Sequence, residues 1–316
     1  MRVVCVSDTH LTVDSIDSES LFPKALAKMS KLEGKEMYRR MRDGIFFAWE
    51  SVRTEVRKFS PDAVVHMGDV TGGWRELGMM NGDVRHLAHQ VMADMRRIAP
   101  NAFVCPGNHD LGYSHPGSLS GGMTEDSVFF AEQIFSDLWW KFEDEGGVLH
   151  LGVASPIAEY VGKEESILRL VRAQRQFVGD ALSDHDGPWV LYTHSPLVVR
   201  HLSREIEVHE DNLLQVVAGD LHSPSRGTML RAFAKVCAPI AKFSRRHTVA
   251  KALAKTVICP STAPLWWGGH GFMTLDILDG VPRVDFRKAP RAYTGVLPTE
   301  SATRCLAWML YPSLFS

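Results

Sequence analysis

The chain has 316 residues, of which 45% are hydrophobic and 23% are charged, and 35 Lys and Arg side chains oppose 37 Asp and Glu side chains. This apolar fraction is ordinary for a globular protein and excludes a disordered or collagen-like chain. The length corresponds to about two domains of average size, or to one large α/β domain. A net charge of −2 gives no general reason to expect nucleic acid or a membrane as a partner.

The N-terminal sequence enters a strand-like run at once, so we expect no signal peptide. The five cysteines lie far apart and form no C-x-x-C pair. This spacing argues against a disulfide framework or a zinc knuckle and predicts a cytoplasmic protein.

Short β-branched runs alternate with amphipathic segments along the chain. The predicted strands cover residues 2–7, 62–67, 101–105, 148–154, 189–193, 213–218, 256–259 and 272–277. The predicted helices cover residues 45–59, 84–98, 126–142 and 166–182. In the first helix, the apolar residues share one helical face, which we expect to pack in the core: Ile45, Trp49, Val52, Val56 and Phe59. Strands that alternate with helices indicate a layered α/β fold.

One segment stands out by its charge. Between Leu221 and Leu275 there is no Asp or Glu, while eight side chains are basic. Aromatic and aliphatic residues alternate with these charges, and Pro239 divides the stretch into two helical pieces. A basic amphipathic helical pair can bind anionic lipid head groups or phosphate-rich ligands, although a solvated helix face explains the pattern equally well.

Residues that commonly bind metals follow five of the predicted strands directly. They are Asp8 and His10, then Asp69, then Asn108, His109 and Asp110, then His194, and finally Asp220 and His222. In open α/β sheets the ligand crevice lies beyond the carboxyl ends of the strands, so we expect the five groups to converge. A single Asp-x-His or Gly-Asp is a weak signal, but five such groups in this order are not expected by chance.

This set of residues suits a pair of divalent cations. Two ions about 3.5–4 Å apart need a shared carboxylate and further oxygen and nitrogen ligands on each side. Aspartate oxygens with neutral imidazoles suit Mn, Fe or Zn, whereas cages of oxygen alone suit Mg or Ca. Such a pair can polarise a phosphoryl group and activate a bridging water for in-line attack. The predicted reaction is therefore phosphoester hydrolysis.

The motif order Asp-x-His, Gly-Asp, Gly-Asn-His-Asp, His and Gly-x-x-His resembles the calcineurin-like metallophosphoesterase superfamily. The resemblance covers roughly residues 1–290 and leaves 291–316 as a C-terminal extension. It implies an α/β fold, a four-layer β-sandwich of two mixed sheets flanked by helices. It also implies helical cap insertions at about residues 20–60 and 226–255.

The resemblance also assigns roles. It implies that the first metal is held by Asp8, His10, Asp69 and His222, and that Asp69 bridges to a second metal completed by Asn108, His194 and Asp220. His109 would contact the phosphate and assist the leaving oxygen, while Asp110 would orient His109. The expected ions are two manganese ions, with iron and zinc as alternatives.

One motif departs from the family pattern. The family usually has Gly-His-x-His where this chain has Gly219-Asp220-Leu221-His222. If Asp220 coordinates, the additional carboxylate favours a harder metal such as Mn, and if it points away the second site is weak. We favour coordination, because a carboxylate is a competent ligand.

The leading hypothesis is a binuclear phosphoesterase that acts on a phosphomonoester or phosphodiester through a metal-bridging hydroxide. The alternatives are a nuclease of the same superfamily and a non-catalytic scaffold with a decayed site. The expected substrate is a phosphorylated small molecule or a lipid head group. The basic segment 226–255 would contact an anionic membrane or nucleic acid, and no obligate protein partner is expected.

Overall fold

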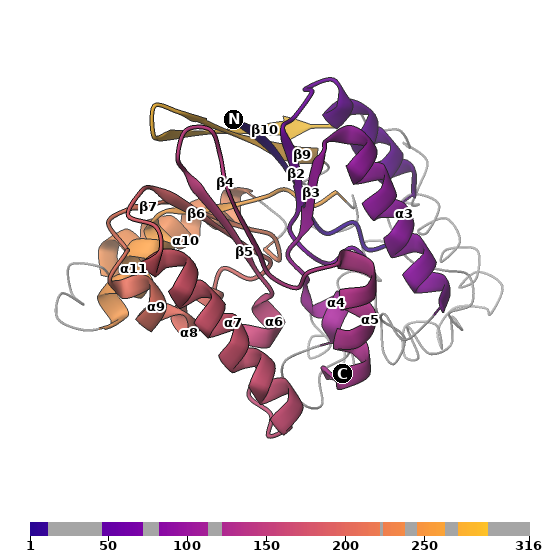
Figure 1. Cartoon of the computed structure of the whole chain (residues 1–316). Helices are drawn as coiled ribbons and strands as arrows, with labels where there is room; N and C mark the ends of the chain where they lie inside the picture. Colours follow the sequence, from indigo (N-terminus) through magenta and orange to yellow (C-terminus); the bar gives the residue numbers. More distant parts are fainter. Residues whose placement is uncertain are drawn as a thin grey trace, which may run out of the picture.

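The computed structural model describes residues 1–11, 46–71, 82–112, 122–221, 224–237, 245–262 and 271–289. In these residues two five-stranded sheets lie face to face, with helices on their outer sides (Figure 1). His222, most of segment 20–60 and the extension 291–316 lie outside the described residues.

Both sheets are mixed. The first has the order β10-β9-β1-β2-β3, and its strands are β1 (Arg2–Val6), β2 (Ala63–His66), β3 (Asn101–Val104), β9 (Gly271–Leu278) and β10 (Val281–Lys288). The strands β1, β2 and β3 run parallel, whereas β9 is antiparallel to both β1 and β10. The second has the order β4-β5-β6-β7-β8, and its strands are β4 (Trp140–Glu143), β5 (Leu149–Val153), β6 (Trp189–Thr193), β7 (Leu213–Ala218) and β8 (Thr256–Ile258). Only β4 is antiparallel to its neighbour.

Helices complete the layers. Residues 46–57 are helical, and the labelled helices are α3 (Gly82–Ile98), α4 (Asn108–Leu111), α5 (Glu125–Phe135), α6 (Ser155–Ala158), α7 (Glu165–Ser183), α8 (Val198–His201), α9 (Ser203–Glu207), α10 (Pro224–Cys237) and α11 (Arg245–Ala254). Figure 1 shows α3 beside the first sheet and α7 to α11 beside the second.

The alternation of side chains along β1 explains the layering. Val4 and Val6 pack with Trp49 and Val52 of the helix at 46–57, on the outer face of the first sheet. Val3 and Cys5 point the other way and pack between the two sheets. A strand buried on both faces reads as a continuous apolar run, as this one does.

The family-derived fold expectation is confirmed, since both sheets are mixed and helices flank them. All eight predicted strands form, within about two residues of their predicted ends. The predicted helices at 84–98 and 166–182 also form, and the apolar stripe at Trp49, Val52 and Val56 is buried.

The predicted helix at 126–142 was wrong in its second half. The helix α5 ends at Phe135, because Ser136 has φ 71°. The chain then forms β4, whose Trp140 enters the space between the sheets and stacks on Phe103. The strand β10 was not predicted at all, since it is a largely exposed edge strand without an apolar run.

The basic segment forms the expected pair of helices, α10 and α11. Several of its charges are used inside the fold: Lys251 pairs with Glu210 at 2.6 Å, and Arg231 donates to the Thr256 carbonyl at 2.9 Å. The Lys255 ammonium donates to the Glu210 carbonyl at 3.2 Å. Part of the positive charge therefore joins α10 to β8 and α11 to the segment before β7.

Cys5, Cys105 and Cys259 are free and buried. Among the described residues, no helix combines the length and the apolarity that crossing a membrane requires.

Candidate metal centre

The pairing of β1 with β2 continues beyond the strands into the two loops that follow them. The backbone N–H of Asp8 donates to the Gly68 carbonyl at 3.0 Å, and that of His10 donates to the Asp69 carbonyl at 3.0 Å. The N–H of Leu11 donates to the Val70 carbonyl at 3.1 Å. These bonds place the Asp-x-His and Gly-Asp motifs side by side.

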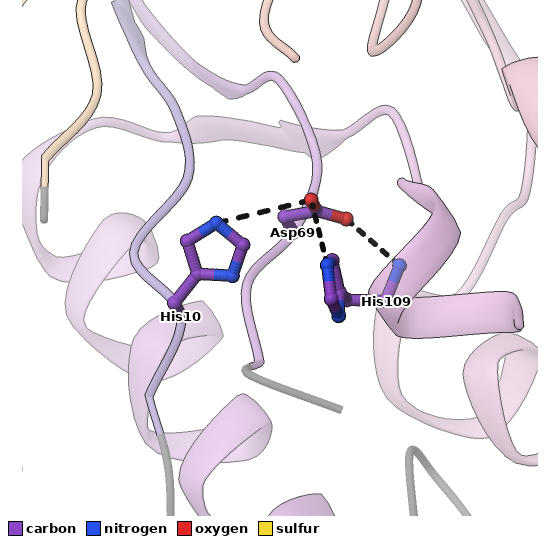
Figure 2. Close-up of side chains that lie close together, drawn as sticks. All are labelled: His10, Asp69 and His109. Carbon is purple, nitrogen blue, oxygen red and sulfur yellow. Dashed lines mark hydrogen bonds and ion pairs between the residues drawn. The ribbon is translucent and has the colours of Figure 1, made fainter. Parts of the chain in front are cut away.

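The Asp69 carboxylate lies at the middle of the centre (Figure 2). Its Oδ2 atom is 3.2 Å from Nε2 of His194, 3.9 Å from Nε2 of His10 and 4.0 Å from Nε2 of His109. Its Oδ1 atom accepts a hydrogen bond from the backbone N–H of His109 at 2.9 Å, which fixes the carboxylate plane. One oxygen of Asp69 therefore lies near three imidazoles that come from three separate segments, the loop after β1, helix α4 and the loop after β6.

His194 is held in one ring orientation. Its Nδ1 donates to the Met67 carbonyl at 2.7 Å, so Nε2 turns toward Asp69. The same Nε2 lies 3.2 Å from Oδ1 of Asn108 and 3.9 Å from Oδ1 of Asp220. A backbone carbonyl on the far ring nitrogen is one of the usual partners that orient a metal-binding histidine.

Asp8 approaches the centre from the β1 loop. Its side chain is fully buried, and its Oδ1 atom lies 3.8 Å from Nε2 of His10. Its Oδ2 atom accepts a hydrogen bond from the Ser7 hydroxyl. Asp8, Asp69 and His194 each offer a ligand atom, and these atoms all lie within 4.8 Å of one another.

The backbone of these loops is strained. Asp8, His10, Asp69 and Asp220 have φ of 53°, 48°, 53° and 49°. They make up four of the seven non-glycine residues with positive φ in the described part of the chain. Such conformations cost free energy and cluster at functional sites, where the surrounding structure enforces them.

Two glycines allow the loops to approach each other. A Cβ atom on Gly107 would lie 2.2 Å from Oδ1 of Asp69, and one on Gly68 would lie 2.8 Å from Cγ of His194. Gly68 also has φ +91°, which favours glycine. The tight space around Asp69 thus depends on residues without side chains.

Asp110 connects two of these loops through hydrogen bonds. Its carboxylate accepts hydrogen bonds from the backbone N–H groups of Gly107 at 3.0 Å and Thr71 at 3.2 Å. Burial, with the nearby charge of Asp69, raises the pKa of Asp110 to about 6 against these hydrogen bonds. The expected contact that orients His109 stays a prediction.

The centre favours positive charge. Burial acts to raise the pKa of Asp69, but the charges of His194 and His109 outweigh it, and this pKa lies well below its usual range. Burial acts to lower the pKa of His194, but Asp69 outweighs it and the pKa is raised well above the ordinary value. A cation at this position, whether a protonated imidazole or a metal ion, is therefore stabilised by the carboxylates.

The residues fit a metal ion. Two ligands of one ion with bond lengths of about 2.1 Å can be at most about 4.2 Å apart. The distances from Asp69 Oδ2 to the three imidazole nitrogens, 3.2 to 4.0 Å, satisfy this limit. Mixed carboxylate oxygen and imidazole nitrogen donors are typical of Mn, Fe and Zn sites.

The structure brings together nearly all of the candidate residues. Seven of them meet at the carboxyl ends of the strands: Asp8, His10, Asp69, Asn108, His109, His194 and Asp220. Asp110 lies next to this cluster and accepts a hydrogen bond from Gly107. His222 lies outside the described residues. The metal and catalytic roles assigned to these residues stay predictions.

One acidic residue near the centre was missed. Burial and the charge of Asp220 raise the pKa of Glu159, which is hydrogen-bonded to Ser195, the neighbour of His194. Glu159 comes directly after α6, the short helix that follows β5, and β5 corresponds to one of the three predicted strands whose ends carry no motif. Its place after a strand end was the only sequence signal for it.

Two mixed sheets with an Asp and His cluster at the ends of their strands agree with the arrangement expected for the metallophosphoesterase class. The family model described as calcineurin-like phosphoesterase matches residues 1–224, and the chain belongs to this family. A comparison with curated proteins gives no match.

The close approach at Gly107 gives a direct test of this geometry. We expect Gly107→Ala to displace the Asp69 carboxylate and to lower the Mn²⁺ affinity about 10–100-fold. A loss of this size is typical when the groups that hold a metal ligand in place are disturbed. The control is Gly179→Ala within α7, where an added Cβ meets nothing within 4 Å. That variant should gain about 0.5–1 kcal/mol in unfolding free energy and keep its metal affinity. Wild-type Mn²⁺ binding by Gly107→Ala in a calorimetric titration would contradict the assignment of Asp69 to the centre.

Proposed function

We propose that the protein hydrolyses a phosphomonoester or phosphodiester with two divalent cations, for which manganese is our first choice. The observation that carries the proposal is the position of Asp69 Oδ2. It lies 3.9 Å from Nε2 of His10 and 3.2 Å from Nε2 of His194, two histidines that the family pattern assigns to different metal sites, so one carboxylate oxygen is within reach of both. The family pattern assigns Asp8, whose Oδ1 atom lies 3.8 Å from Nε2 of His10, to the first site. The Asp8 carboxylate also lies within 4.8 Å of ligand atoms of Asp69 and His194. Asn108 and Asp220, which lie near Nε2 of His194, are assigned to the second site.

Two bound cations would polarise the phosphoryl group, neutralise its charge and make a water more acidic. The chain itself would supply orientation and a proton. Asp69 is fixed by the N–H of His109, and the His194 ring is fixed by the Met67 carbonyl. Both groups are therefore ordered before a substrate arrives, which reduces the reorganisation needed during the reaction.

His109 is suited to assist the leaving group. It lies on α4, its ring packs edge-on against His10 with centroids 5.0 Å apart, and its side chain is 13% exposed. The ring therefore reaches both the centre and the solvent side from which an ester would enter. A protonated imidazole there can donate to the departing oxygen.

The role of His109 can be tested with chromogenic esters. We expect the wild-type protein with Mn²⁺ to cleave p-nitrophenyl phosphate, bis(p-nitrophenyl) phosphate, or both. His109→Ala should keep its bound manganese but lose roughly 10²–10⁴ in kcat, as is usual when a general acid is removed. Metal content and steady-state rates measured on the same samples give both quantities. Absence of turnover by the wild-type protein across esters and metals would instead support the scaffold hypothesis.

Metal stoichiometry tests the shared carboxylate. Asp69→Asn should weaken both sites, because its Oδ2 serves both groups of ligands, while Asp220→Ala should lose roughly one ion per chain. Elemental analysis after dialysis against Mn²⁺ measures both effects. Equal metal content in Asp220→Ala and wild type would show that Asp220 does not coordinate, and an active Asp69→Asn would refute the bridge.

We further propose that α10 binds to an anionic lipid surface. Met229 and Phe233, one helical turn apart on this helix, are 73% and 68% exposed, and Lys235 farther round the same helix is also exposed. Exposed apolar side chains combined with basic ones on one helix are typical of helices that lie in a membrane interface. The charges of Lys251 and Arg231, which are used internally, do not contribute to this surface.

Vesicle sedimentation tests this proposal. We expect binding to phosphatidylserine-containing vesicles, lowered about tenfold or more by Phe233→Ser, because the membrane contact of one large apolar side chain is lost. Phe129→Ser on α5 is the matched control, since Phe129 is 52% exposed but lies on another helix. Equal loss in both variants, or salt-dependent binding to oligonucleotides without vesicle binding, would contradict the lipid proposal.

A further inference from the structure

His66, the last residue of β2, is fully buried near the metal centre. Its hydrogen bonds connect the loop after β1 with the loop after β2. The backbone N–H of Gly68 donates to its Nδ1 at 3.2 Å. Since Nδ1 accepts a hydrogen bond, the ring proton is on Nε2, which lies 3.2 Å from the Thr9 hydroxyl. That hydroxyl in turn donates to the Val70 carbonyl at 2.7 Å. The hydrogen bonds therefore run in one direction, from Gly68 through His66 and Thr9 to Val70.

Each end of this chain of hydrogen bonds acts on a different part of the centre. Thr9 lies between Asp8 and His10, which belong to the first group of ligands. The N–H of Gly68 belongs to the same peptide unit as the Met67 carbonyl, which accepts the hydrogen bond from Nδ1 of His194 at 2.7 Å. This peptide plane is thus held between two histidines, one of which is a candidate ligand of the second group.

We propose that His66 is a positioning residue that couples the two halves of the metal centre. Through Thr9 it fixes the loop that carries Asp8 and His10, and through the Met67–Gly68 peptide it fixes the ring of His194. The inference rests on the proposed function, because it requires two ions whose ligands must be aligned together.

The chemistry of the site supports a neutral His66. An imidazolium carries a proton on both nitrogens and could not accept from Gly68. Burial, with the charge of His194, lowers the pKa of His66 to about 3, so the ring is neutral near pH 7. Without this acceptor the turn at Gly68 would leave a buried N–H without a partner, which is costly.

The test uses the full chain and Mn²⁺ as the probe, with calorimetric titration and electron paramagnetic resonance of the bound ions. Thr9→Val removes the hydroxyl at nearly constant shape and should weaken one Mn²⁺ site about 10–100-fold, as is typical for partners of metal ligands. Thr9→Ser keeps the hydroxyl and should remain within about threefold of wild type. His66→Phe should weaken both sites, and His66→Asn, whose side-chain oxygen can still accept from Gly68, should restore the second site in part.

Thermal unfolding of the metal-free variants separates positioning from simple loss of stability. The inference requires Thr9→Val to lose Mn²⁺ affinity while the metal-free protein remains folded and Thr9→Ser behaves as wild type. It is overturned if Thr9→Val and Thr9→Ser bind both ions equally well, or if they weaken equally. Should His66→Phe not fold, the Thr9 pair decides alone. Binding of fewer than two ions by the wild type would refute the proposed function instead, so the two failures can be distinguished.

Discussion

The parallel pairing of β1 with β2 is the constraint on which the centre depends. The ladder does not stop at the ends of the strands but continues through the bonds from Asp8 to Gly68, from His10 to Asp69 and from Leu11 to Val70. Because these bonds join backbones, the positions of the candidate ligands are set by the sheet and not by flexible side chains. A site held on rigid elements keeps its geometry within the narrow limits that metal binding and catalysis require.

This geometry has a cost that the rest of the fold offsets. Four candidate ligand residues adopt positive φ, several acidic and imidazole groups are removed from water, and two glycines are needed where backbones meet. Each feature alone destabilises the folded chain. The valines of β1 and β2, packed on both faces of the first sheet, supply the apolar burial that offsets it. The strain is concentrated at the edge of the sheet where the ligands lie, and the apolar packing lies behind it.

The sequence predicted the strands and the gathering of ligand residues well, because both depend on local patterns that the sheet then aligns. It failed where the outcome depends on contacts between distant residues. The segment after Phe135 has enough apolar residues to continue an amphipathic helix. It forms β4 instead, because Trp140 packs in the space between the two sheets. The strand β10 is stabilised by its pairing with β9 and not by burial, so no apolar run marks it. His66 reads as one residue of an ordinary strand, and its role depends on the turn at Gly68 that no motif describes.

The position of Asp220 follows from the same logic. Its Oδ1 atom lies 3.9 Å from Nε2 of His194, and its side chain is 42% exposed, so it lies at the solvent-facing edge of the cluster. If Asp220 coordinates, as we propose, its carboxylate adds negative charge to a cluster that already contains Asp69, and Glu159 lies near enough to respond to it. Oxygen donors and accumulated negative charge favour a hard ion over zinc. The two halves would then differ in chemistry: imidazole and carboxylate on the His10 side, and an oxygen-rich set on the Asp220 side.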